Sequence, residues 1–164
     1  MKLRNEPELM FMASSYCSVA ERCVHDVRAK LMASGASPDV EKRIIDRLKK
    51  DGFIDENRYC RSFVRDKFRL NHWGRIKIGY ELRAKRIDAD TIAEAIRDEI
   101  ADDDYEATLM ELLKVKKSSV KGQSAQDIFS KLCRFAAGRG FEESLIVRCV
   151  KTILHDSDST ETVE

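Results

Sequence analysis

Apolar residues recur at three- and four-residue steps along most of the chain, which is the spacing of one face of an α-helix. The clearest example spans residues 55–70. Its apolar positions are Tyr59, Cys60, Phe63, Val64 and Phe68. Asp51-Gly52 precedes it as a helix stop, and Asp55 is placed to cap its first turn. A further helix is predicted over 74–85.

The same reasoning predicts helices elsewhere and no strand. They cover residues 18–34, 37–51, 88–100, 102–113, 124–137 and 142–154. Polar residues that can accept a hydrogen bond from the first turn mark the expected starts, because they satisfy orphan backbone N–H groups. These caps are Ser18 in a capping box with Glu21, Ser37 before Pro38, Asp88, Asp102 or Asp103, and Ser124 in a capping box with Asp127.

The helices repeat in groups of three. Apolar residues at positions 78, 82, 87, 92 and 96 match those at 132, 136, 141, 146 and 150 with a constant offset of 54 residues. We therefore expect an all-α fold of tandem three-helix repeats. Each repeat is too small to bury enough surface alone, so neighbouring repeats should pack on one another in an elongated, curved array.

Five parts follow from this pattern, and the last repeat is truncated to two helices. They are a loose N-terminal extension at 1–16 with a short helix near 9–12, repeat 1 at 17–70, repeat 2 at 71–118, repeat 3 at 119–156, and a tail at 157–164. The tail is acidic and poor in apolar residues, so we expect it to be disordered.

Composition narrows the class of protein. Of 164 residues, 43% are hydrophobic and 36% are charged, and no segment approaches the ~20 apolar residues of a membrane span. The five cysteines lack metal-ligand spacing, so we expect buried, reduced thiols. Without a membrane span or a secretory signal the protein is expected in the cytoplasm, and we expect a monomer. The sequence has no phosphate-binding glycine loop, nucleophile elbow or zinc motif. We therefore expect no enzyme, no cofactor and no metal site.

Charge is segregated along the chain. Residues 58–86 contain ten Lys or Arg but only Asp66 and Glu81 as acids, which gives +8 (10 − 2) against +1 for the whole chain. Such a segment is either a solvated helix face or a surface for a polyanion or an acidic protein. The acidic stretch from 98 to 111 fits helix starts, where the dipole favours negative charge, better than a metal site.

The candidate partner-binding residues all come from this basic segment. They are Arg58, Arg61, Arg65, Arg69, Arg75, Lys77, Arg83, Lys85 and Arg86. Arg58 has a second interpretation, because it can pair with Asp51 or Asp55. Trp73 lies among the candidates and either stacks on a base or packs the junction between repeats.

One ordered motif runs through the basic segment. It consists of Gly52-Phe53-Ile54-Asp55, Arg58-Tyr59, Phe63, Gly74, Ile78 and Glu81-Leu82. This order resembles the signature of the RecX family, bacterial regulators of the RecA recombinase, and Arg139-Gly140-Phe141 resembles a weaker later signature. Two residues depart from the family pattern. Cys60 stands where the family usually has Ala. Arg86 stands where a Gly often follows the first helix of the second unit.

The resemblance implies a tandem array of three-helix units that lies along the groove of the RecA–DNA filament. It further implies inhibition of strand exchange and of the coupled ATP hydrolysis. From charge and composition we expect weak binding to single- or double-stranded DNA without sequence preference, and no membrane partner. The alternative is a free-standing helical DNA-binding protein, although the basic residues are spread over several helices rather than one recognition helix. A third possibility is a structural adaptor that does not bind DNA.

Overall fold

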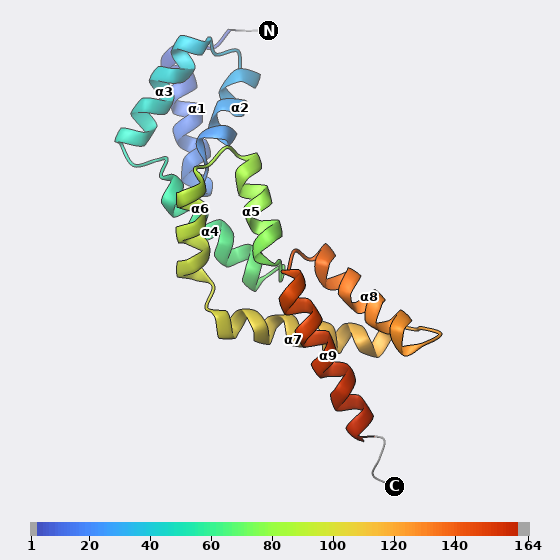
Figure 1. Cartoon of the computed structure of the whole chain (residues 1–164). Helices are drawn as coiled ribbons and strands as arrows, with labels where there is room; N and C mark the ends of the chain where they lie inside the picture. The colour runs from blue at the N-terminus through green and yellow to red at the C-terminus, as the bar shows by residue number, and fades with distance from the viewer. Residues whose placement is uncertain (1–2, 161–164) are drawn as a thin grey trace. The chain divides into compact units, whose positions relative to one another are not determined.

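The computed structural model describes residues 3–160, which form nine α-helices and contain no strand (Figure 1). In chain order the helices are α1 (Glu6–Val19), α2 (Val24–Ala33), α3 (Pro38–Lys50), α4 (Glu56–Arg69), α5 (Arg75–Ala84), α6 (Ala89–Glu99), α7 (Asp102–Ser119), α8 (Ala125–Gly138) and α9 (Glu143–Thr160). The predicted all-α class is confirmed. Within the described residues, every helix is too short or too polar to cross a membrane.

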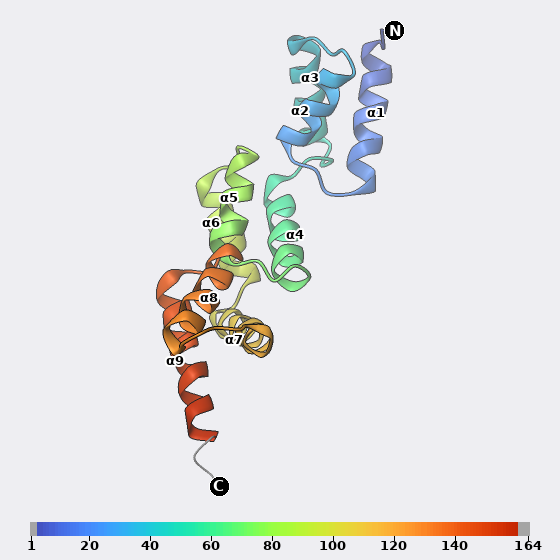
Figure 2. The ribbon, with the colours of Figure 1, turned by 90° about the vertical axis from the view of Figure 1, so that its right-hand side faces the viewer.

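The chain divides into two compact units. Unit 1 contains residues up to Phe63 together with Glu81–Ala95, and unit 2 contains Val64–Tyr80 together with residues from Ile96 onward. The divisions fall inside α4, α5 and α6. In unit 1, α1, α2 and α3 pack on one another, and in unit 2, α7, α8 and α9 do so (Figures 1 and 2).

The core of unit 1 corrects the expectation for the N-terminus. Residues 6–19 form a regular helix, not a loose extension with a short helix near 9–12. Leu9 and Ala13, four residues apart on α1, are buried against Val27 and Leu31 of α2 and against residues of α3. Because α1 contributes one face to the core, it is part of the folded unit.

The start of α1 has a sequence signal that the pattern analysis overlooked. Asn5 accepts a hydrogen bond from the backbone N–H of Glu8 at 2.9 Å, and Glu8 accepts one from the backbone N–H of Asn5 at 3.1 Å. This reciprocal pair is a capping box, and Pro7 occupies the first turn. The capping box predicted at Ser18 is wrong, because Ser18 lies inside α1 and its hydroxyl donates to the carbonyl of Ser14.

Most other predicted caps are confirmed. The first-turn backbone N–H groups donate to the side chains of Ser37, Asp55, Asp88 and Ser124. Asp127 does not complete a capping box at Ser124, since it accepts instead from the backbone N–H of Gln123 at 3.2 Å. Neither Asp102 nor Asp103 caps α7. That helix follows Ala101, which offers no side-chain acceptor.

The C-terminal end of the described chain is helical. Helix α9 extends to Thr160, so the prediction of a disordered tail is wrong for residues 157–160. Residues 161–164 lie outside the described part of the chain, as do residues 1 and 2 of the predicted extension.

An aromatic cluster lies in unit 2, and the repeated apolar positions are core residues of both units. The ring of Tyr105 lies 6.0 Å from that of Phe68 and 4.9 Å from that of Phe141, measured between centroids. All ten positions related by the offset of 54 residues are buried except Ile96, which is half-buried. The periodicity therefore marks core residues, while the proposed repeat boundaries at 17, 71 and 119 stay a prediction.

Two glycines bring distant parts of unit 2 into backbone contact. The N–H of Gly74 donates to the carbonyl of Arg139 at 2.7 Å, and the N–H of Ile76 donates to the carbonyl of Gly140 at 3.0 Å. A Cβ atom on Gly74 would overlap the backbone of Gly140. This junction fixes the start of α5 against the turn between α8 and α9.

Candidate functional site

The nine predicted partner-binding residues lie on α4, on α5 and in the turn after α5. Five belong to unit 1, namely Arg58, Arg61, Arg83, Lys85 and Arg86. Four belong to unit 2, namely Arg65, Arg69, Arg75 and Lys77. Within each unit, some of these residues are paired with a carboxylate of the protein and others are not.

Two of the unit 1 residues pair with carboxylates from the N-terminal third of the chain. The Nε atom of Arg58 donates to Glu21 at 2.5 Å, and its Nη2 atom donates to the carbonyl of Gly52 at 3.0 Å. The ammonium group of Lys85 lies 2.5 Å from Asp26, so it links the end of α5 to α2. The pairing of Arg58 with Asp55 is loose, at 4.0 Å.

The pair formed by Lys85 and Asp26 changes the acidity of both groups. Hydrogen bonding to Asp26 raises the pKa of Lys85. Burial alone would raise the pKa of Asp26, but hydrogen bonds from Lys85 and Cys23 outweigh burial and lower it. Each group therefore holds its charge over a wider pH range, as expected for an ion pair.

The unit 2 residues are engaged in a similar way. Arg65 forms a bidentate pair with Glu99, with N···O distances of 3.1 and 2.9 Å. Arg75 donates to Asp102 at 2.6 Å, and its guanidinium carbon lies 4.1 Å from the centre of the Tyr105 ring. These contacts occupy the groups that would otherwise bind a phosphate.

Trp73 sits between two cations within unit 2. The ammonium groups of Lys67 and Lys77 lie 4.7 and 4.4 Å from the centre of its ring, and Trp73 itself is half-buried. Each contact is a cation–π interaction, which the negative face of the indole stabilises. Lys77 is thus held near its own helix by an aromatic ring rather than by a carboxylate.

Four predicted residues keep their charge exposed. Arg61, Arg69, Arg83 and Arg86 have no ion pair or side-chain hydrogen bond with another residue that the structure describes, and all are exposed. Arg86 has a φ of 58°, in the left-handed region where a glycine is usually found. The atypical residue noted in the motif therefore retains the backbone conformation of the glycine and adds a charge.

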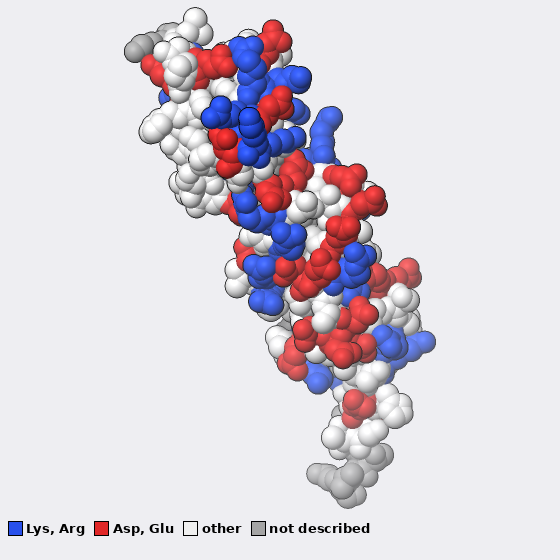
Figure 3. Space-filling model, turned by 90° about the vertical axis from the view of Figure 1, so that its left-hand side faces the viewer, with Lys and Arg blue, Asp and Glu red and all other residues white. Residues whose placement is uncertain are grey.

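The excess charge of residues 58–86 is thus partly cancelled in space. Glu21, Asp26, Glu99 and Asp102 lie outside that segment and neutralise four of its cations. Figure 3 shows basic and acidic side chains interspersed over the face that it displays. The acidic stretch after residue 98 supplies ion-pair partners, and the described residues contain no His, Cys, Asp and Glu grouping suited to a metal ion.

The cysteines behave as core residues. Cys23, Cys60 and Cys149 are buried, Cys17 and Cys133 are half-buried, and all five are free thiols. Burial raises the pKa of the Cys23 and Cys60 thiols to about 11. A thiol with this pKa is protonated at neutral pH and is a poor nucleophile.

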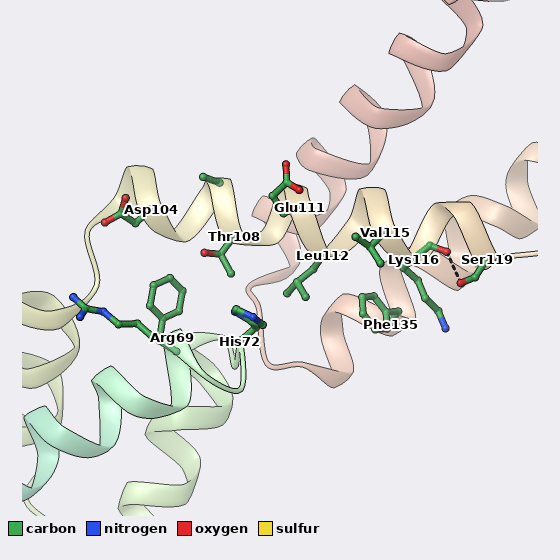
Figure 4. Close-up of a pocket in the computed structure, with 12 residues that line it drawn as sticks. Arg69, His72, Asp104, Thr108, Glu111, Leu112, Val115, Lys116, Ser119 and Phe135 are labelled. Carbon is green, nitrogen blue, oxygen red and sulfur yellow. Dashed lines mark hydrogen bonds between the residues drawn. The ribbon is translucent and has the colours of Figure 1, made fainter.

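Sequence reasoning missed a groove of about 810 Å³ beside α7 in unit 2 (Figure 4). Its apolar surface comes from Phe68, Leu112, Val115 and Phe135, and charged residues including Arg69 border it. Val115 is 69% exposed although it is apolar. The sequence signal for this groove was Val115, an apolar residue that lies outside the buried face formed by Leu109 and Leu113 of α7.

Comparison with known proteins identifies the family. A family model described as the second three-helix domain of RecX matches residues 55–96, from the cap of α4 into α6. A protein named regulatory protein RecX from Pseudomonas entomophila is 32% identical over 126 residues, covering 75% of this chain and 77% of that protein. The chain belongs to the RecX family.

Other RecX proteins match over most of their length. The regulatory protein RecX of Prosthecochloris aestuarii is 27% identical over 142 residues, covering 87% of this chain and 91% of that protein. The crystal structure of RecX from Lactobacillus salivarius has a TM-score of 0.80 and 20% identity, covering 90% of this chain and 95% of that one. The all-α helical repeat is thus the fold of known RecX structures.

The RecX motif now has a physical explanation. Its early residues form the turn after α3 and the first turns of α4, where Gly52 has a φ of 78° and Asp55 caps the helix. Gly74 and the later signature glycine, Gly140, form the backbone junction of unit 2. Motif residues thus mostly maintain the fold, and partner contacts have to be sought among the exposed side chains.

Proposed function

We propose that this RecX-family protein binds the RecA–DNA filament and reduces recombinase ATP hydrolysis and strand exchange. The observation that carries the proposal is membership of the RecX family, whose proteins are named regulatory proteins. The protein acts by binding rather than by catalysis, as a monomer in the cytoplasm. Its partners are the filament and, weakly and without sequence preference, single- or double-stranded DNA.

Exposed cations support this proposal more directly than the basic segment as a whole. Arg61, Arg69, Arg83 and Arg86 extend into solvent without a carboxylate partner, so they are the candidates for contact with phosphates or acidic protein groups. The cations already paired within the fold act mainly as structural links. We therefore place the partner contacts of the basic segment on these four residues.

Inhibition follows from binding to a repeating target. A chain of helical repeats offers several surfaces, and contacts with more than one filament subunit add avidity without any single strong contact. A protein that bridges subunits opposes rearrangements that require those subunits to move. Filament dynamics change only if the protein binds one filament state more tightly than another.

Titration of the protein into recombinase on single-stranded DNA, with ATP turnover as the readout, tests the proposal. We expect turnover to fall as the protein approaches saturation of the filament. Unchanged turnover at micromolar excess would remove the regulatory function. Tight, sequence-selective binding to naked duplex DNA would instead favour a free-standing DNA-binding protein.

A further inference from the structure

A second cluster of basic side chains lies outside residues 58–86, around the connection between α7 and α8. Residues 114–134 contain six basic residues and one acidic residue, which gives +5 (6 − 1). The basic residues are Lys114, Lys116, Lys117, Lys121, Lys131 and Arg134. All belong to unit 2, where α7 and α8 pack on one another and are joined by a short loop (Figure 1).

Two adjoining hollows shape this surface. One of about 720 Å³ is lined by Lys121, Gly122, Gln123, Ser124, Asp127 and Lys131. The other, of about 460 Å³, shares Lys121 and Lys131 with the first and adds Lys116, Ser119, Val120, Arg134 and Phe135. Four cations from two helices and their connecting loop therefore converge on one continuous depression.

Part of this charge is neutralised within the protein, since Lys114 lies 4.0 Å from Glu111 and the ammonium group of Lys116 lies 5.2 Å from the centre of the Phe135 ring. Asp127 is the one carboxylate in the segment, and it pairs with Lys131 at 3.2 Å. Lys131 also donates to the backbone carbonyl of Lys121 at 2.6 Å, which fixes its position. The exposed side chains of Lys121 and Arg134 have no hydrogen bond or ion pair within the described part of the chain. Two of the six cations in residues 114–134 are thus in ion pairs, against at least four of ten in residues 58–86.

The lining favours nucleic acid over a protein partner. The first hollow contains no apolar side chain, and the second has only Val120 and Phe135, whereas protein interfaces are usually anchored by several buried aromatic or aliphatic residues at their centre. Closely spaced phosphates match several cations that converge where apolar side chains are few, and binding them releases condensed counterions. We propose that the α7–α8 surface, defined by Lys116, Lys121, Lys131 and Arg134, binds the phosphate backbone of a nucleic acid strand.

None of the candidate cations of α4 and α5 lines these two hollows, and binding there does not require a recombinase. The test therefore uses the full chain with a fluorescently labelled 30-nucleotide single strand and a matched duplex, without recombinase. The test variant is Lys121→Glu/Arg134→Glu, because both side chains are exposed and make no internal pair. The control variant is Arg97→Glu/Lys151→Glu, which changes the net charge by the same amount at exposed positions on α6 and α9 of unit 2.

Fluorescence anisotropy at several salt concentrations separates the outcomes, and circular dichroism checks that both variants keep their helix content. We expect the test variant to bind at least roughly tenfold more weakly, with a log–log salt slope shallower by about 1.4 for two lost single-strand contacts. The control should stay within roughly twofold of the parent chain, because its residues line neither hollow.

Three results would overturn the inference. Equal losses in the test and control variants would show a general effect of net charge. Unchanged DNA binding in the test variant, with reduced inhibition of recombinase, would assign the surface to a protein partner. Absence of DNA binding by the parent chain would rule out the nucleic acid site. It would not rule out the proposed regulation of recombinase, which the titration of ATP turnover tests separately.

Discussion

At the scale of single residues, the contact between Gly74 and Gly140 constrains the chain most tightly. We expect Gly74→Ala to lower the free energy of unfolding by about 1–3 kcal/mol, because the added methyl group must displace the backbone of the α8–α9 turn. Chemical denaturation followed by circular dichroism measures this change.

Gly138→Ala is the matched control for that substitution. Gly138 ends α8, and an added Cβ atom there meets no atom within 4 Å. We expect this variant to gain up to about 1 kcal/mol of stability, because alanine favours the helix more than glycine does. A Gly74→Ala variant that is as stable as Gly138→Ala would show that the junction is not tightly packed.

Single residues also show what sequence can reveal and what it cannot. Asp55 and Ser124 were predictable as caps because a cap acts on backbone three residues away. The partners of Arg58, Arg65 and Lys85 were not, since they lie 37, 34 and 59 residues away in the sequence. Which arginines stay exposed is therefore a property of the tertiary structure.

At the scale of helices, the Asp26–Lys85 pair links α2 to α5 and gives a prediction for pH dependence. The lowered pKa of Asp26 means that its contribution to stability is complete above the unfolded value of about 3.9 and is lost as the pH falls through the lower folded value. The raised pKa of Lys85 means that its contribution is lost only as the pH rises through a value above about 10.4.

The variant Asp26→Asn tests this link. We expect it to lower the free energy of unfolding by roughly 1 kcal/mol at pH 7, because the pair is partly exposed and screened by solvent. The difference from the parent chain should shrink as the pH falls below about 4. Asp46→Asn, at an exposed position of α3, is the control. A difference that stays constant from pH 7 to pH 3 would contradict the prediction.

Helix positions were predictable wherever an apolar face repeats regularly. Helices α3 to α6 follow the expected boundaries closely, because each has a cap, a stop signal or both. Helix α1 was missed because apolar residues such as Met10, Phe11 and Met12 stand in a row, which hides the buried pair Leu9 and Ala13. Helix α9 continues past the predicted end into polar residues, where periodicity gives no signal.

At the scale of the whole molecule, the nearly neutral net charge of +1 conceals two basic surfaces, each with paired and free cations. On α4 and α5, cations alternate between internal pairs and free side chains, and on the α7–α8 surface Lys131 is paired while Lys121 and Arg134 are free. The family was predictable from the motif, but this division was not. The elongated, curved outline expected from the repeats stays a prediction for small-angle scattering.

Direct measurement of binding to the filament tests the central claim, that this chain regulates a recombinase by binding its nucleoprotein filament. Filaments assembled on immobilised single-stranded DNA with a slowly hydrolysed ATP analogue are titrated with the parent chain and two variants. Arg61→Glu/Arg69→Glu/Arg83→Glu reverses free cations of α4 and α5. Lys42→Glu/Arg97→Glu/Lys151→Glu changes the net charge equally at other exposed positions.

We predict that the parent chain binds filaments more tightly than either bare DNA or free recombinase, since only the filament offers several subunits at once. The first variant should bind at least roughly tenfold more weakly, and the control should stay within roughly twofold of the parent chain. Binding to filaments that is no tighter than binding to bare DNA would contradict the claim.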